Sequence, residues 1–131
     1  MKASSLSFQA AILMGLAGMC WGVYMAISDD RSTLPAHAHL NLLGFVTLFL
    51  FGVYYRLHPA LDGAPIARLQ ITIWIVATIV LIIGVAMVHS GKRAGDPIAA
   101  VSSLIVIADM LLFGWLMMRN ESGTSAAGSV R

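Results

Sequence analysis

"LQITIWIVATIVLIIGVAMVH", residues Leu69–His89, contains no charged side chain, and this stretch decides the class of the protein. At 1.5 Å per residue, a helix of this length crosses about 30 Å, the thickness of the hydrocarbon core of a bilayer. Three further stretches are similarly long and apolar, at about 8–27, 35–57 and 98–118. The sequence therefore predicts four membrane-spanning helices.

The composition agrees with an integral membrane protein. Of the 131 residues, 59% are hydrophobic and 11% are charged, and the mean hydropathy is +0.85. A soluble domain carries about 25% charged residues. The formal net charge of +2 is small and spread along the chain, so the charge does not suggest a nucleic-acid partner. The single Cys20 excludes an internal disulfide, and there is no CxxCH motif for covalent attachment of haem.

The segments between the spans are polar, and Pro35 and Pro97 each stand where a helix can begin. We expect an all-α fold, an up-and-down four-helix bundle formed by one domain at 1–118, followed by a disordered polar tail at 119–131. We expect the first span to be retained. Met19 precedes Cys20, where a lipoprotein cleavage site requires a small residue.

Basic residues near the ends of the spans weakly favour a cytoplasmic N-terminus. With that orientation four lie inside and three outside: Lys2, Arg56, Arg68 and Arg119 against Arg31, Lys92 and Arg93. An even number of spans places both termini on the same side. We therefore expect a multi-pass protein of a bacterial inner membrane, with both termini in the cytoplasm.

Three of the four histidines are expected at one level of the membrane. Because consecutive spans are antiparallel, the start of the second span and the end of the third lie at the same side of the membrane. His37 and His39 therefore lie at the same membrane level as His89. Lys92 and Arg93 follow just beyond, whereas His58 belongs to the opposite face. Residues two apart on a regular helix point about 200° apart, so His37 and His39 should face different neighbours. Histidines at an interface can also simply lie among headgroups.

Two further features lie inside the spans. Small residues recur on the first two helices, where they either let the helices approach closely or leave a slot for a flat macrocycle: Gly15, Gly18, Gly22, Gly44 and Gly52. Asp109 stands near the middle of the fourth span, where a carboxyl group usually faces a bundle interior. Its expected partner is a hydroxyl, an amide or water, with Thr47 and Thr78 as candidates. Structural hydrogen bonding and proton handling both remain open for it.

The second span, "HLNLLGFVTLFLFGVYYRLHP" at 39–59, resembles the second transmembrane helix of the catalytic subunit of haem–copper oxidases, most closely the nitric oxide reductase branch. The matching positions are His39, Asn41, Leu42, Leu43, Gly52, Tyr54, Tyr55 and Pro59. In that family the histidine is an axial ligand of the low-spin haem and lies toward the outer face. The resemblance covers one span of this chain. The ligands of the binuclear centre are missing, so a complete oxidase is not expected.

The resemblance implies a small membrane protein that binds haem b without a covalent link. It implies His39 as an axial ligand, and we expect His89 as the second ligand and Lys92 and Arg93 beside the propionates. With two imidazoles the iron would transfer electrons. With His39 alone it would keep a position open for a gas such as nitric oxide or oxygen.

Two other hypotheses stay open. His37, His39 and His89, with His37 the least expected of the three, offer nitrogen ligands for a copper or zinc site, which would indicate a metal-handling protein. Alternatively, the chain is a structural accessory or assembly subunit of a respiratory complex. Because the room for a haem inside one four-helix bundle is tight, we expect a homo-oligomer or a larger respiratory complex.

Overall fold

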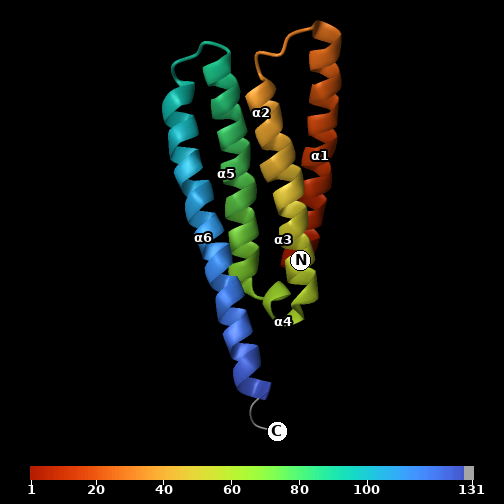
Figure 1. Ribbon diagram of the computed structural model, residues 1–131, viewed down its shortest axis with the longest axis vertical. Coiled ribbons are helices and arrows are strands. Elements are labelled where there is room, and N and C mark those ends of the chain that lie inside the picture. Colours follow the sequence, from red (N-terminus) through yellow and green to blue (C-terminus); the bar gives the residue numbers. More distant parts are fainter. Residues whose placement is uncertain (129–131) are drawn as a thin grey trace.

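The computed structural model describes the backbone of residues 1–128 and the side chains of residues 1–120. The described chain is helical apart from short connections (Figure 1), and its elements are α1 (Ala3–Ser28), α2 (Leu34–His39), η1 (Leu40–Thr47), α3 (Leu48–Leu57), α4 (Pro59–Asp62), α5 (Pro65–His89) and α6 (Gly95–Gly128). The continuous run α2–η1–α3 forms the second span. Within the described residues, four helices are long and apolar enough to cross a membrane: Ala3–Ser28, Leu34–Leu57, Pro65–His89 and Gly95–Asn120. The predicted multi-pass, all-α membrane fold is confirmed.

The four spans run up and down beside one another in the order α1, α2–η1–α3, α5, α6 (Figure 1). The N-terminus lies at the same end of the bundle as α4 and the later turns of α6, and we call this the α4 end. The α1–α2 and α5–α6 connections lie at the opposite end, which we call the loop end. α6 packs mainly along α5, and it reaches the second span through Phe113, whose ring centroid lies 4.2 Å from that of Phe51. The bundle is therefore an elongated row with α1 and α6 at its two edges.

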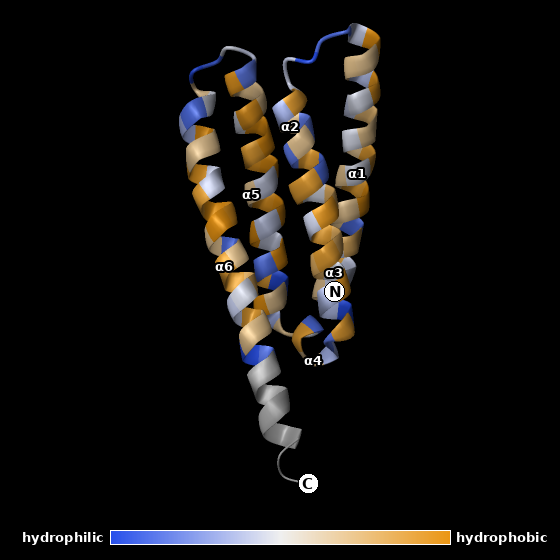
Figure 2. Ribbon diagram, in the orientation of Figure 1, coloured by the Kyte–Doolittle hydropathy of each residue, from blue (hydrophilic) through white to orange (hydrophobic). Residues whose placement is uncertain are grey.

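Apolar side chains cover the outside of the spans, as a lipid environment requires. Figure 2 shows hydrophobic residues along all four helices and hydrophilic residues in the connections at the loop end and around α4. Large exposed apolar side chains come from every span, including Leu13, Leu42, Ile83 and Leu111. At the α4 end, Arg56 lies over the ring of Phe8 and Arg119 over that of Trp115, with 5.8 Å and 5.1 Å to the ring centroids. Cation–aromatic pairs of this kind suit a membrane–water boundary.

The glycines of the first two spans serve close packing. Asn41 fills the space beside Gly18 so completely that a Cβ there would lie 2.5 Å from the Asn41 Oδ1. Phe45 lies in the same way against Gly15, and Phe8 of α1 lies against Gly52. These side chains occupy the space that a macrocycle would need between the two helices. Of the two readings of this glycine stripe, the structure supports helix packing.

The helix ends extend beyond the predicted spans. α1 begins at Ala3 and α5 at Pro65, several residues before the apolar runs at 8–27 and 69–89. α6 continues past the predicted end at Met118 to Gly128. Adding residues to an existing helix avoids the cost of nucleation, so polar residues can continue it. The disorder expected for the tail at 119–131 stays a prediction, and residues 129–131 lie outside the described part of the chain.

Candidate functional site

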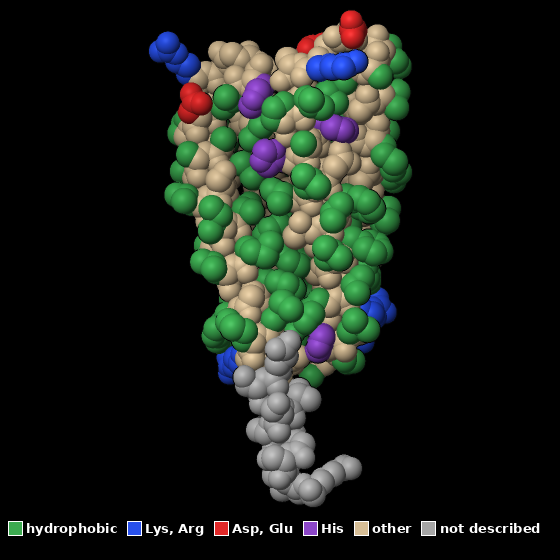
Figure 3. All heavy atoms as spheres, viewed as in Figure 1, with side chains coloured by type: hydrophobic (Ala, Val, Ile, Leu, Met, Phe, Trp, Pro, Cys, Tyr) green, Lys and Arg blue, Asp and Glu red, His purple; other side chains and the backbone are tan. Residues whose placement is uncertain are grey.

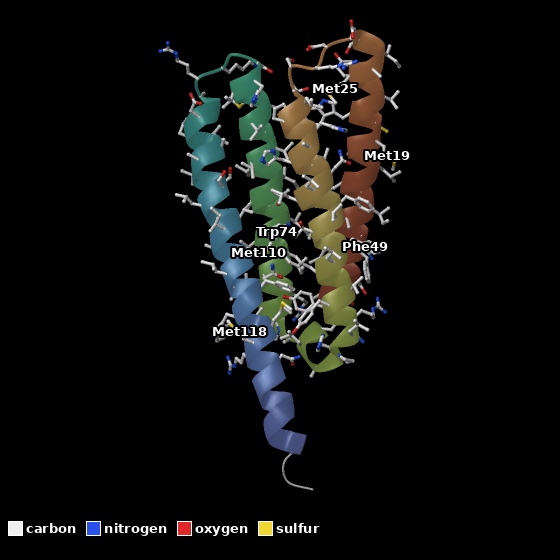
Figure 4. All side chains as sticks on the ribbon, viewed as in Figure 1. Met19, Met25, Phe49, Trp74, Met110 and Met118 are labelled. Atoms are coloured by element: carbon white, nitrogen blue, oxygen red, sulfur yellow. The ribbon has the colours of Figure 1, made fainter. Side chains whose placement is uncertain are left out.

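A π-helix, η1, interrupts the second span directly after His39. Three side chains donate to carbonyl groups in η1 or at the start of α3. Thr47 Oγ1 donates to the Leu42 carbonyl at 2.9 Å, and Trp74 Nε1 of α5 donates to the Leu43 carbonyl at 3.0 Å. Figure 4 labels Trp74, which lies in the middle of the bundle. Ser7 Oγ of α1 donates to the carbonyl of Leu48, where α3 begins, at 2.6 Å. Such π-segments are rare and often mark functional sites.

His39, the residue directly before the π-helix, is held in a defined orientation. Its Nδ1 lies 2.7 Å from the carbonyl oxygen of Pro35. Because a carbonyl can only accept, Nδ1 carries the hydrogen, and Nε2 keeps its lone pair. The imidazole is half-buried and lines a cavity of about 220 Å³ with Ala38, Leu42 and Leu43. This is the tautomer that a histidine needs to bind a metal through Nε2.

His37 faces a different neighbour, as the two-residue spacing predicted. Its ring lies against Gly22 of α1, where a Cβ would come within 3.2 Å of the His37 Cε1. Asn41 Nδ2 donates to the His37 carbonyl at 2.9 Å and lies 3.3 Å from the ring Nε2. Asn41 therefore partners His37 one turn earlier. The His-x-Asn motif does not bring His39 and Asn41 together.

His89, Lys92 and Arg93 all lie at the loop end and are exposed. Figure 3 shows histidine side chains gathered near this end and a further one near the α4 end. His89 Nδ1 lies 2.9 Å from the Val85 carbonyl, so its Nε2 is also free to accept a metal. Among the described residues, no hydrogen bond or ring contact joins His89 to His39. Lys92 lines a shallow cavity of about 300 Å³ with Trp21 and Met87.

Metal ligands do not converge within this one chain. Among residues with described side chains, no three of His, Cys, Asp and Glu lie close enough to hold one ion. Within the described residues of one chain, His37, His39 and His89 are thus not assembled into a site, and a site that they form across a protomer boundary stays a prediction. The cavity at His39 also falls below the roughly 300–1,000 Å³ of typical cofactor pockets. The donor atom of His39 fits an axial haem ligand, but the walls around a macrocycle would have to come partly from another surface.

His58 lies at the α4 end, apart from the other histidines. Its ring stacks on Tyr54 with 4.1 Å between centroids, and its Nδ1 lies 2.7 Å from the Tyr54 carbonyl. It thus makes the same contact with the carbonyl four residues earlier as His39 and His89 do. His58 is therefore a matched control for any role assigned to His39.

Asp109 is buried and belongs to a polar network that joins three spans. Gln70 Nε2 of α5 donates to Asp109 Oδ2 at 2.6 Å, and the Tyr55 hydroxyl of α3 donates to Gln70 Oε1 at 2.8 Å. The partner is an amide, one of the three kinds of partner that were expected, but neither named candidate bonds to Asp109. Thr47 donates within η1, and Thr78 Oγ1 is buried with no partner among the described residues. Gln70, a polar residue inside an otherwise apolar span, was the signal that sequence reasoning missed.

Asp62 is a second buried carboxyl group, at the α4 end, that the sequence analysis did not single out. The backbone N–H of Ser4 donates to its Oδ1 at 2.7 Å, and Ser4 Oγ donates to its Oδ2 at 2.9 Å. Asp62 therefore caps the N-terminus of α1 from α4. This contact explains why α1 begins as early as Ala3.

The fold and the polar contacts define a multi-pass helical membrane protein with a histidine beside a π-helix. Comparisons of the chain with protein-family models, with curated proteins and with solved structures give no match.

Proposed function

We propose that this protein binds haem b in the membrane, with His39 as an axial ligand. The observation that carries the proposal is the orientation of His39, whose Nδ1–H is fixed on the Pro35 carbonyl so that Nε2 is left for iron. The π-helix that follows and the resemblance of 39–59 to the haem-binding helix of the oxidases add support. Haem held by two imidazoles transfers electrons, and haem held by one binds a gas at its open position.

Different residues of this chain would supply the ligand and the apolar surface for haem. His39 supplies the ligand, while Ala38, Leu42 and Leu43 supply an apolar surface beside it. The cavity is too small to enclose a macrocycle, so the proposal includes a second surface, from another copy of the chain or from a larger respiratory complex. At the loop end, the second ligand would be His89, whose Nε2 makes no hydrogen bond among the described residues. The propionates would lie beside the cations Lys92 and Arg93.

An optical spectrum of the purified protein, oxidised and then reduced with dithionite, tests the proposal. His39→Ala is expected to abolish the haem bands or leave a weak high-spin spectrum. His89→Ala is expected to convert a six-coordinate spectrum into a five-coordinate one that binds carbon monoxide. His58→Ala is the matched control, since His58 has the same ring contact at the opposite end, and it should leave the spectrum intact. A folded protein without a Soret band, after expression with ample haem, would contradict the proposal.

The orientation proposed for the membrane places the α4 end in the cytoplasm of a bacterium and the loop end outside. The test uses a protein in which alanine replaces Cys20. One variant then carries a single cysteine at Ala60 of α4, and another carries one at Ser90 of the loop end, and both positions are exposed. A membrane-impermeant thiol reagent should label Ser90→Cys in intact cells and Ala60→Cys only after lysis. The reverse pattern would place His39 in the inner half of the membrane and remove the correspondence with the oxidase helix.

A structural accessory subunit is the second candidate, and the edge position of α6 favours it. An apolar groove of about 590 Å³ runs between α5 and α6 and is lined by side chains that include Val76, Val80 and Val101. If the purified protein lacks haem but is lost from the membrane when a respiratory complex is absent, this candidate replaces the first.

A further inference from the structure

The two buried carboxyl groups differ in how their oxygens are paired. Both oxygens of Asp62 accept a hydrogen bond from Ser4. At Asp109 only Oδ2 accepts one, from Gln70, and Oδ1 is buried with no partner among the described residues. The side chain is 2% exposed, so water does not reach it at the surface of the bundle. An ionised carboxylate with a single hydrogen bond is costly in such an interior.

Among the described residues, no Lys, Arg or His forms an ion pair or a hydrogen bond with Asp109. The titratable group that α3 contributes to the network is the phenol of Tyr55, which donates to Gln70, and the group that α5 contributes is the neutral amide of Gln70. Phe113, one turn further along α6, packs on Tyr55 with 5.8 Å between ring centroids. A neutral carboxylic acid is less costly to bury there than a carboxylate. Its carbonyl oxygen can accept from Gln70 at Oδ2, and its proton then belongs on Oδ1, the oxygen that has no partner among the described residues.

Tyr55 determines which end of the Gln70 amide faces Asp109. Because the Tyr55 hydroxyl donates to Gln70 Oε1, the amide presents its N–H to the carboxyl group. Both side chains are fully buried. Tyr55 and Gln70 are therefore positioning residues, since Gln70 donates to Asp109 and Tyr55 donates to Gln70, with no hydrogen bond between Tyr55 and Asp109 among the described residues.

We propose that Asp109 is a proton-binding site inside the membrane, which holds its proton on Oδ1, and that Gln70 and Tyr55 position the carboxyl group for this role. The bound species is a proton, and the step is the reversible protonation of one carboxylate oxygen. The proposal is independent of haem, because it concerns other residues in another part of the bundle.

Infrared spectroscopy of the protein in lipid tests the proposal directly. A protonated carboxyl group gives a C=O stretching band that an ionised one lacks. We expect this band in the unmodified protein, a shift of the band to lower frequency in D₂O, and its loss as the pH is raised. Asp109→Asn should remove the band, while Asp62→Asn, the matched control, should leave it. Tyr55→Phe should retain the band at an altered frequency, because the hydrogen bond from Gln70 changes.

Each other outcome counts against the site. If the band is absent, or persists in Asp109→Asn, Asp109 does not hold the proton. A band that neither shifts in D₂O nor responds to pH would make Asp109 a permanently neutral hydrogen-bonding group. Should Asp109→Asn fail to assemble, Asp109→Glu keeps the carboxyl group, and an unmoved band in that variant would likewise overturn the assignment.

Discussion

Asp62 and Asp109 are the same residue type, and both are almost completely buried, at 1% and 2% exposure. Asp62 lies at the α4 end, where the N-terminus of α1 presents an N–H group and the positive end of its dipole. Asp109 lies deep in the fourth span, where one amide of Gln70 is its hydrogen-bond donor among the described residues. The comparison distinguishes a carboxyl group whose two oxygens both stabilise the fold by hydrogen bonds from one that has an oxygen without a partner among the described residues, which is available to bind a proton.

The difference follows from where each residue lies relative to helix ends. At a helix end, backbone N–H groups lack intrahelical partners and attract an acceptor. In the middle of a span, all backbone groups are paired, so only side chains can serve a carboxyl group. Asp62 therefore finds two donors in one neighbouring residue, Ser4. Asp109 depends on Gln70, which in turn depends on Tyr55.

The largest expected effect is that of Asp62→Leu. This change leaves the N–H and the hydroxyl of Ser4 buried without an acceptor and removes the tie between α4 and α1. Losing a helix cap together with a charged hydrogen bond should lower the free energy of unfolding by about 3 kcal/mol. Thermal unfolding in detergent, followed by circular dichroism, measures the loss. Asp62→Asn keeps one acceptor and should lose less, and equal losses would show that hydrogen bonding is not the cause.

Asp109→Leu should lower the free energy of unfolding by about 1–2 kcal/mol, less than Asp62→Leu does. It leaves only one donor, Gln70 Nε2, without its acceptor. Asp109→Asn preserves an acceptor oxygen and should stay within about 1 kcal/mol of the unmodified protein. The same unfolding measurement checks both variants. A loss for Asp109→Asn as large as that for Asp62→Leu would mean that Asp109 is as structural as Asp62, and the contrast would fail.

The fold was largely predictable from the sequence because lipid imposes a strong constraint. Uninterrupted apolar runs such as 69–89 have few alternatives to a spanning helix, and the short polar connections leave only an up-and-down order. The helix ends were less predictable. The early start of α1 depends on Asp62, which is distant in sequence, and hydropathy contains no information about such a partner.

The sequence identified candidate polar residues of the sites, but it did not identify the residues to which they bond. Asp109 stood out as an intramembrane carboxyl group, and the spacing of His37 and His39 correctly placed them on different sides of the helix. The partner of Asp109 could not be derived, because it depends on how α5 and α6 align. The π-helix was also missed. The carbonyls of its residues are satisfied partly by Trp74, which approaches only once the bundle has packed. The roles of His39 and His89 in binding haem stay predictions.

The smallest expected effect is the coupling energy between Gln70 and Asp109, and its comparison with the coupling energy between Ser4 and Asp62 is the sharpest test of the contrast. A double-mutant cycle with Ser4→Ala and Asp62→Asn should give a coupling of about 1.5 kcal/mol, because the hydroxyl of Ser4 donates to a carboxyl group; the backbone N–H of Ser4 is present in every variant and does not enter the coupling. The cycle with Gln70→Leu and Asp109→Asn should give only about 0.6 kcal/mol, the usual value for side-chain hydrogen bonds between membrane helices. The value is small because the unfolded chain in a bilayer finds other partners for its polar groups. Free energies of unfolding for the single and double variants give both couplings.

If the Gln70–Asp109 coupling energy exceeds that of Ser4 and Asp62, the hydrogen-bond network in the span contributes more to stability than the cap of α1 does. Asp109 would then be held too strongly by Gln70 to exchange its proton as a free binding site.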